Sequence, residues 1–240
     1  MNSATAIDPD MSLGAIVNAF PSLARQLERL DLDYCCGGER SLADACRATE
    51  LDPRAVVIEL VAHVGDGDAP APWSSMPVGE LVEHLVNTHH RYLWDELPRL
   101  QALVDKVLGV HGDRHPELVD IARCFSLIRA DIEPHLTKEE RVLFPAIQQL
   151  ADASADATFG FGSVVNPVSM MLREHDHLGG LLRELRLSTD DYTPPVDGCG
   201  SYSALFSGLE QVEADTHLHI HKENNVLFPR VIELEARRNS

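Results

Sequence analysis

The sequence predicts an all-α protein in which an antiparallel four-helix bundle follows a small helical N-terminal domain. Three observations carry this prediction. Apolar residues recur at helical spacing through most of the 240 residues, no segment alternates convincingly like a β-strand, and one helical motif occurs twice. Hydrophobic residues make up 44% of the chain and charged residues 24%, which is typical of an ordinary globular protein. A disordered or fibrous protein is therefore excluded.

The first region, residues 1–66, is predicted to be a small helical module. Its apolar residues recur every three or four positions, and Pro21 is expected to open a new helix. Ser41 and Asp44 have the spacing of a helix-capping pair. Several short helices are expected rather than one long one, because these start signals interrupt the periodic pattern.

A linker is predicted to separate this module from the bundle. The stretch from 65 to 79 is rich in Gly, Pro, Ser and Asp and lacks hydrophobic periodicity. We expect the linker over residues 67–79 and the bundle over residues 80–240. Four long amphipathic stretches follow, and helices of this length predict an antiparallel bundle. They lie near residues 77–109, 115–150, 167–188 and 200–238.

The bundle sequence contains an internal repeat. The segment HLTKEERVLFPAI, which starts at His135, aligns without gaps with HIHKENNVLFPRV, which starts at His219, and seven of the thirteen positions are identical. The first and third stretches align in nearly the same frame, so that His90 falls on His175. The bundle is therefore interpreted as a duplicated helix pair, in which each half contributes one single His and one H-x-x-x-E motif.

Helical geometry directs six of these side chains into one core. Residues four positions apart share a helix face, so the His and the Glu of each H-x-x-x-E motif project together. Both pairs and the two single histidines are in line with apolar residues of their helices. A single His on an apolar stripe is usually a hydrogen-bonded core residue, but two repeated halves favour a shared site. The six residues are His90, His135, Glu139, His175, His219 and Glu223.

These residue types indicate a metal site. An ionised carboxylate buried without a partner costs several kcal/mol, and Lys and Arg are scarce on these stripes. Bundle cores bind metals through inward-facing Glu and His, and nitrogen and oxygen ligands without thiolate suit iron or manganese. We predict a dinuclear site, most plausibly of iron. A mononuclear zinc site and a ferritin-like carboxylate site are the alternatives, although ferritin-like sites use the opposite E-x-x-H order.

The other histidines of the chain are assigned no ligand role. His84, His177, His217 and His221 are out of phase with the ligands and are predicted to face solvent. The register of the first ligand stays open, because His89 is adjacent to His90. His90 is preferred since it lies on the apolar stripe and matches His175. The remaining histidines have no firm role, namely His63, His111 and His115.

Two carboxylates lie where they could orient ligand imidazoles. Asp131 is one turn before His135, and Glu174 is next to His175. Either could accept a hydrogen bond from a ligand histidine. The alternative is that both are ordinary surface carboxylates.

Charge and cysteine content narrow the class of partner and the compartment. Lys plus Arg is 20 and Asp plus Glu is 38, so the formal charge is −18, which disfavours nucleic acid and anionic membranes as partners. The acidic N-terminus does not resemble a signal peptide, and a cytoplasmic protein is expected. The five cysteines do not predict a disulfide framework. Cys35 and Cys36 are adjacent on a Gly-rich turn, where they are either reactive thiols or plain loop residues.

The sequence resembles the repair-of-iron-centres family, a branch of the hemerythrin-like proteins, over essentially the whole chain. The motifs that carry the resemblance are DYCCGG at 33–38, HLTKEERVLFP from His135, REHD at 173–176 and HIHKENNVLFP from His219. The H-x-x-x-E motifs alone would indicate only a hemerythrin-like bundle, whereas DYCCGG ahead of that bundle is more specific. The resemblance implies that the four histidines are terminal iron ligands and that Glu139 and Glu223 bridge an oxo- and carboxylate-bridged pair of iron ions.

The resemblance also implies a role in repairing iron–sulfur clusters damaged by nitric oxide or oxidants. Three activities are compatible with it. The chain could supply iron to damaged iron–sulfur proteins, with Cys35 and Cys36 as a thiol relay or redox switch. It could instead reduce nitric oxide as an enzyme, or bind nitric oxide or oxygen reversibly. No catalytic residue is assigned, and the chain is compatible with a homodimer.

Overall fold

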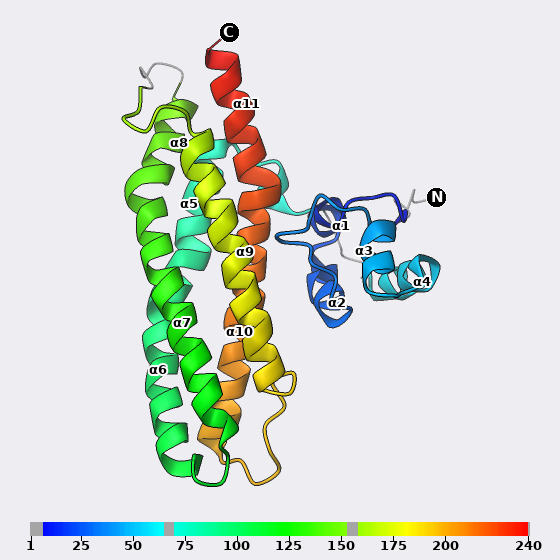
Figure 1. The fold of residues 1–240 in the computed structure, drawn as a ribbon. Coiled ribbons are helices and arrows are strands. Elements are labelled where there is room, and N and C mark those ends of the chain that lie inside the picture. Colours follow the sequence, from blue (N-terminus) through cyan, green and yellow to red (C-terminus); the bar gives the residue numbers. More distant parts are fainter. Residues whose placement is uncertain (1–6, 65–69, 153–157, 240) are drawn as a thin grey trace.

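The computed structural model describes residues 7–64, 70–152 and 158–239. Within these residues the regular structure is helical, apart from one isolated bridge between Ser12 and Ser41. Long helices run along a common axis, and a group of short helices lies to one side of them (Figure 1). The predicted all-α fold, a four-helix bundle preceded by short N-terminal helices, is confirmed.

The N-terminal helices begin where the sequence signals them. Pro21 opens a short 3-10 helix, and the side chain of Ser41 accepts a hydrogen bond from the backbone N–H of Asp44. The predicted linker contains a further short helix, and its residues 67–69 lie outside the described residues. These elements are α1 (Leu13–Ala19), η1 (Pro21–Leu23), α2 (Ala24–Arg29), α3 (Leu42–Ala48), α4 (Pro53–His63) and η2 (Pro72–Ser74).

The bundle helices occupy the four predicted stretches, and three of them are interrupted near their middle. The first comprises α5 (Val78–Leu85), η3 (Val86–His90) and α6 (Arg91–His111). The second comprises α7 (Glu117–Lys138), η4 (Glu139–Leu143) and α8 (Phe144–Ala151). The third is α9 (Val165–Ser188), and the fourth comprises α10 (Gly200–Lys222), η5 (Glu223–Leu227) and α11 (Phe228–Arg238).

The interruptions η3, η4 and η5 are single π-helical turns, which the sequence reasoning did not predict. Pro145 and Pro229 lie two residues after the second and third of these turns, in the repeated VLFP segments. A proline inside a helix lacks the N–H for one backbone bond and crowds the carbonyl four residues earlier. A wider turn relieves that crowding. Glu139 and Glu223 each begin such a turn, so the repeat builds the same local backbone at both carboxylates.

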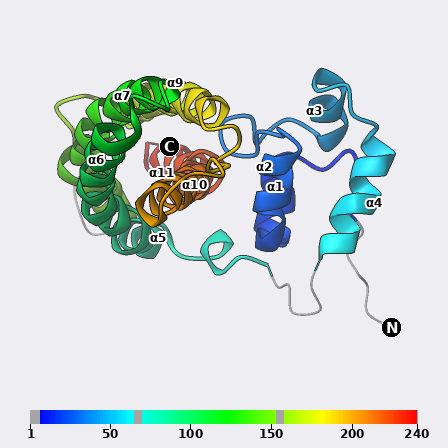
Figure 2. The same cartoon turned by 90° about the horizontal axis from the view of Figure 1, so that it is seen from below.

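Two apolar clusters lie on either side of the His and Glu residues. One cluster contains Leu93 and Ile132, together with other residues of α6, α7, α9 and α10, and it continues through the N-terminal helices. The other contains Leu85, Leu143 and Met171 at the opposite end of the bundle. The N-terminal helices lie beside α9, α10 and α11 when the molecule is viewed along its axis (Figure 2). Among the described residues, no helix combines the length and the apolar character that a membrane crossing requires.

Candidate metal centre

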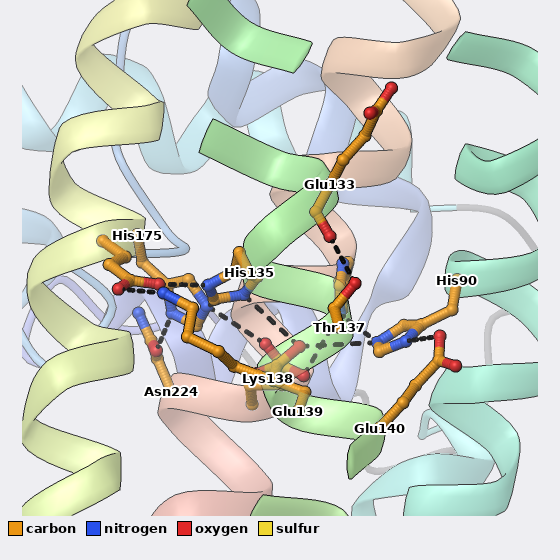
Figure 3. Close-up of polar contacts among 12 residues, drawn as sticks. His90, Glu133, His135, Thr137, Lys138, Glu139, Glu140, His175 and Asn224 are labelled. Atoms are coloured by element: carbon orange, nitrogen blue, oxygen red, sulfur yellow. Dashed lines mark hydrogen bonds and ion pairs between the residues drawn. The ribbon is translucent and has the colours of Figure 1, made fainter. Parts of the chain in front are cut away.

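The structure brings all six predicted ligands together in the bundle. Figure 3 labels four of them, His90, His135, Glu139 and His175. One cluster contains His90, Glu139, His219 and Glu223. The other contains His135, Glu139, His175 and Glu223, so the two carboxylates belong to both clusters. All six side chains are buried, with at most 4% of any residue exposed. Two clusters that share two carboxylates form a binuclear arrangement.

The potential ligand atoms face one another at short range. His90 Nε2 lies 3.2 Å from His219 Nε2, and His135 Nε2 lies 3.1 Å from His175 Nε2. Glu139 Oε2 is 3.3 Å from His135 Nε2 and 3.5 Å from His90 Nε2. In the other half of the repeat, the oxygens of Glu223 lie 3.1 Å from His219 Nε2 and 3.2 Å from His175 Nε2.

The hydrogen bonds of three imidazoles at Nδ1, the nitrogen that points away from the cluster, determine the protonation of Nε2, the nitrogen that points into it. His90 Nδ1 lies 3.0 Å from Glu140 Oε1, and His135 Nδ1 lies 2.9 Å from Glu174 Oε2. His175 Nδ1 lies 2.7 Å from Asn224 Oδ1. These oxygens only accept hydrogen bonds, so each Nδ1 is the donor. A neutral imidazole that donates from Nδ1 presents a lone pair at Nε2, which is the tautomer that binds metals.

The donor set therefore fits a pair of cations. The inner nitrogens converge on one another, and both oxygens of Glu139 accept no hydrogen bond from any described residue. Oε2 of Glu223 is also without a hydrogen bond within that part of the chain. Buried carboxylate oxygens without donors are costly, and a metal ion in each cluster would satisfy the oxygens and the lone pairs together.

Protonation partly replaces the missing positive charge when no metal is bound. Burial alone would lower the pKa of His135, but the Glu139 carboxylate beside it raises the pKa to about 10. The pKa of Glu174 falls to about 2, mainly because it accepts a hydrogen bond from His135. Burial opposes ionisation of Glu223, yet His219 and His175 hold its pKa well below the usual range. Metal binding must therefore release protons from this centre.

The two carboxylates expected beside the ligands have different surroundings. Glu174 contacts His135, as described above, and also pairs with Lys138. Asp131 instead lies 3.1 Å from His177 Nε2, and both side chains are largely exposed. Two further contacts of this kind were missed, those of Glu140 and Asn224. Their signal was present in the repeat, because both residues directly follow the Glu of an H-x-x-x-E motif.

Three of the four histidines predicted to face solvent do not. His221 is fully buried, with Nδ1 3.2 Å from the carbonyl oxygen of Tyr34 and Nε2 3.1 Å from Asn18 Oδ1. His217 is half-buried with Nδ1 3.3 Å from Glu28 Oε1, and His84 is half-buried against Lys222. Both His217 and His221 point away from the ligands as expected, but the N-terminal helices cover that face of α10. Only His177 is exposed.

His89 and His90 lie on different sides of their helix, which resolves their register. His90 belongs to the ligand cluster, whereas His89 Nε2 lies 2.7 Å from the amine of Lys222. His89 Nδ1 lies 2.9 Å from Asp215 Oδ1. The ring of His89 also stacks on that of His219, with 5.3 Å between the centroids. His111, which had no firm role, is buried at the end of α6 with Nε2 3.2 Å from Cys199 Sγ.

The two adjacent cysteines lie next to the metal centre but outside it. Cys35 is buried and Cys36 is half-buried, on the loop between α2 and α3. The carbonyl oxygen of Cys35 accepts hydrogen bonds from the side chains of Asn224 and Asn225, at 3.4 and 2.9 Å. All five cysteines carry free thiols, as expected.

Comparison with known proteins adds a family relationship to this geometry. Residues 81–231 match the family model described as "Hemerythrin HHE cation binding domain". Residues 9–63 match ScdA_N, described only as a domain of unknown function. A protein of Enterobacter sp. (strain 638) named iron-sulfur cluster repair protein YtfE is 34% identical over 93% of this chain and 97% of its own length. Proteins of the same name from Citrobacter koseri and Escherichia coli O157:H7 are 33% identical over the same shares.

Proposed function

This chain belongs to the repair-of-iron-centres branch of the hemerythrin-like proteins, and from that premise we propose that it repairs damaged iron–sulfur clusters by supplying iron. The names of its relatives support this role, and so does the site. The observation that carries the proposal is the pair of His and Glu clusters that share Glu139 and Glu223. Damaged iron–sulfur proteins are the proposed partners.

We propose iron as the metal because the ligand atoms are imidazole nitrogens and carboxylate oxygens, without thiolate. Bound iron would act there as a redox-active Lewis acid, and the same ion could be released to a damaged cluster. The chain's own residues bind and orient it. His90, His135, His175 and His219 present their inner nitrogens, and Glu139 and Glu223 neutralise charge from between the clusters. Glu140, Glu174 and Asn224 hold three of the imidazoles in the required tautomer.

Metal analysis and Mössbauer spectroscopy of anaerobically purified protein test the identity of the metal. Close to two antiferromagnetically coupled irons per chain is the expected result. One zinc ion per chain would contradict the dinuclear iron proposal.

A repair assay tests the proposed function directly. Iron-loaded protein is mixed with a purified iron–sulfur enzyme whose cluster has been damaged by nitric oxide. The enzyme should regain activity in proportion to the iron that the chain loses, while iron-free chain should restore nothing. Failure of fully loaded protein to restore activity would refute the proposal.

Reaction with nitric oxide at the same centre is the second candidate. Each cluster contains four donor residues, whereas iron accepts about six ligands, so positions remain for a small diatomic molecule. Reduction of nitric oxide would yield nitrous oxide over many turnovers when a reductant is added. Reversible binding would stop at about one nitric oxide per site and yield no nitrous oxide.

A further inference from the structure

A second group of potential metal ligands lies outside the His and Glu centre, on the loop between α2 and α3. Asp33, Cys35 and Cys36 each offer one ligand atom, and these atoms lie within 4.8 Å of one another. Cys35 Sγ is 3.9 Å from Cys36 Sγ and 3.2 Å from Asp33 Oδ1. We call this group the dithiol site. None of its three side chains contributes the hydrogen bonds from Glu140, Glu174 and Asn224 that orient the ligand imidazoles.

The loop holds these three side chains in place by its own hydrogen bonds and close packing. Asp33 Oδ1 accepts hydrogen bonds from the backbone N–H groups of Cys35 and Cys36, at 3.1 and 2.9 Å. The two glycines that follow allow the chain to turn tightly. A Cβ at Gly37 would lie 2.9 Å from the carbonyl oxygen of Asp33, and a Cβ at Gly38 would lie 2.5 Å from that of Tyr34. The ligand atoms are therefore preorganised.

A cavity of about 130 Å³ opens beside the dithiol site, between this loop and helices α9 and α10. Its lining includes five acidic residues and two arginines. Both arginines are paired, Arg183 with Asp31 and Arg186 with Glu213. The cavity therefore favours a cation. Gly179 of α9 leaves room beside the thiol, because a Cβ there would still lie 3.8 Å from Cys36 Sγ.

The spacing of the donors matches a tetrahedral metal. Two thiolates on one ion at about 2.3 Å each lie about 3.8 Å apart, and Cys35 Sγ and Cys36 Sγ are 3.9 Å apart. We propose that Cys35, Cys36 and Asp33 bind a single divalent transition-metal ion of the Zn²⁺ or Fe²⁺ kind, with its remaining position open to the cavity. Thiolate ligands select such metals over Mg²⁺ and Ca²⁺.

The dithiol site is one side chain away from the metal centre. Asn224 accepts a hydrogen bond from Nδ1 of the ligand His175 and donates one to the carbonyl oxygen of Cys35. If the chain supplies iron, as proposed above, the dithiol site is where an ion leaving the bundle is held before transfer. The location of this step rests on the proposed function, whereas the binding of a metal to the dithiol does not.

Metal binding at the dithiol site must displace protons. The hydrogen bond to Cys36 and the burial of the side chain raise the pKa of Cys35 well above its usual range. Two thiols therefore exchange two protons for one divalent ion, and no electron is transferred. Binding should weaken as the pH falls.

Cobalt(II) is the probe for the test, because its thiolate complexes absorb strongly in the near ultraviolet by sulfur-to-metal charge transfer. The ligands of the bundle contain no sulfur, so Co²⁺ bound there does not give this band. The full-length protein, already loaded with iron, is titrated anaerobically with Co²⁺. We expect the band to saturate at one equivalent, with release of two protons. No thiolate band in the wild-type chain would overturn the proposal.

Three variants locate the thiolates. Cys36→Ser should at least halve the intensity of the band, because only the Cys35 thiolate remains, and the double variant Cys35→Ser/Cys36→Ser should abolish it. Asp33→Asn should weaken Co²⁺ binding at least tenfold. Cys199→Ser is the matched control, because Cys199 is the exposed cysteine and lies at the start of α10. Its band should be unchanged. A band of full intensity in Cys36→Ser, a band that survives in the double variant, or a band that disappears in Cys199→Ser would place the thiolate elsewhere and refute the assignment.

Folding and function are read separately from the band. An unchanged helical circular dichroism spectrum and unchanged iron content in Cys36→Ser show that the variant is folded. Gly179→Leu leaves both thiols in place but fills the cavity beside Cys36, and it should weaken Co²⁺ binding. Normal binding in that variant would contradict the position assigned to the ion. A chain that binds Co²⁺ here but fails the repair assay would refute the proposed function and leave the dithiol site intact.

Discussion

The two halves of the bundle repeat have the same ligands but different outer contacts. In the first half, Glu140 accepts hydrogen bonds from His90 and from the indole of Trp94, and it remains partly exposed. In the second half, Asn224 occupies the matching position, and its amide joins His175 to the loop of the N-terminal helices. The two halves therefore share the ligand positions and differ at the neighbouring positions, where their surroundings differ.

Other matched positions diverge in the same way. Thr137 donates a hydrogen bond to the carbonyl oxygen of Glu133 in its own helix, whereas its counterpart His221 contacts the N-terminal helices. Lys138 is half-buried, whereas its counterpart Lys222 is buried against His84 and His89. At these positions the first half of the repeat is partly open to solvent, whereas the second half is covered by the N-terminal helices and their loop. The covered half, through Asn224, links the metal centre to the dithiol site.

The largest expected effect comes from the shared carboxylates. Glu139→Gln and Glu223→Gln should each reduce the iron content to less than one per chain, because each carboxylate belongs to both clusters. Metal-free Glu139→Gln should melt at a lower temperature than the metal-free wild type, because the Glu139 carboxylate stabilises the charged ring of His135. Metal-free Glu223→Gln should melt at a lower temperature, because His219 and His175 stabilise that carboxylate.

Metal analysis and thermal melts of both variants make this measurement. The exposed Glu83→Gln is the control and should change neither quantity. Retention of two irons by either buried variant would show that its carboxylate is not shared.

Acid should loosen the covered half selectively. Burial lowers the pKa of His221 from 6.5 to about 4, so the folded protein contains the neutral ring. Its stabilising contribution is full above pH 6.5 and is lost as the pH falls toward 4, by up to about 3 kcal/mol. Urea unfolding between pH 7.5 and 4.5 measures the slope. His221→Gln cannot titrate and should flatten that slope, and an unchanged slope in this variant would contradict the assignment.

Exchanging the outer acceptors tests the asymmetry of the halves directly. Glu140→Gln should weaken iron binding by about 10- to 100-fold, because a neutral amide supports His90 less than a carboxylate does. Asn224→Asp should leave affinity equal or higher, since it adds a carboxylate behind His175. Competition with a chelator measures both. Equal losses in the two variants would indicate that these contacts serve only packing.

The smallest effect is expected at the contact between the loop and the bundle. In Gly38→Ala the new methyl group would crowd the carbonyl oxygen of Tyr34, at a cost of about 1–3 kcal/mol. The buried Cys35 should then react with iodoacetamide at least tenfold faster while iron content stays the same. Gly79→Ala is the control, because a Cβ there meets no atom within 4 Å. Loss of iron in Gly38→Ala would mean that the loop is part of the metal centre.

The all-α fold and the convergence of six side chains could be predicted from the order of amino acids alone. Both follow from helical periodicity, since residues four apart share a face and an apolar stripe must turn toward a core. The internal repeat then showed that the two halves of the bundle carry equivalent ligands. The direction of each side chain is a local property, because it depends only on the spacing of residues within one helix.

The segments that cover the other faces of these helices could not be predicted in this way. His217 and His221 were predicted to meet solvent because their phase points away from the ligands, yet the N-terminal helices occupy that side. The contacts of Asn224 and Lys222 depend on residues more than a hundred positions away. Periodicity defines the direction of a side chain relative to its own helix axis. The partner that it meets depends on how distant segments pack, which no local spacing encodes.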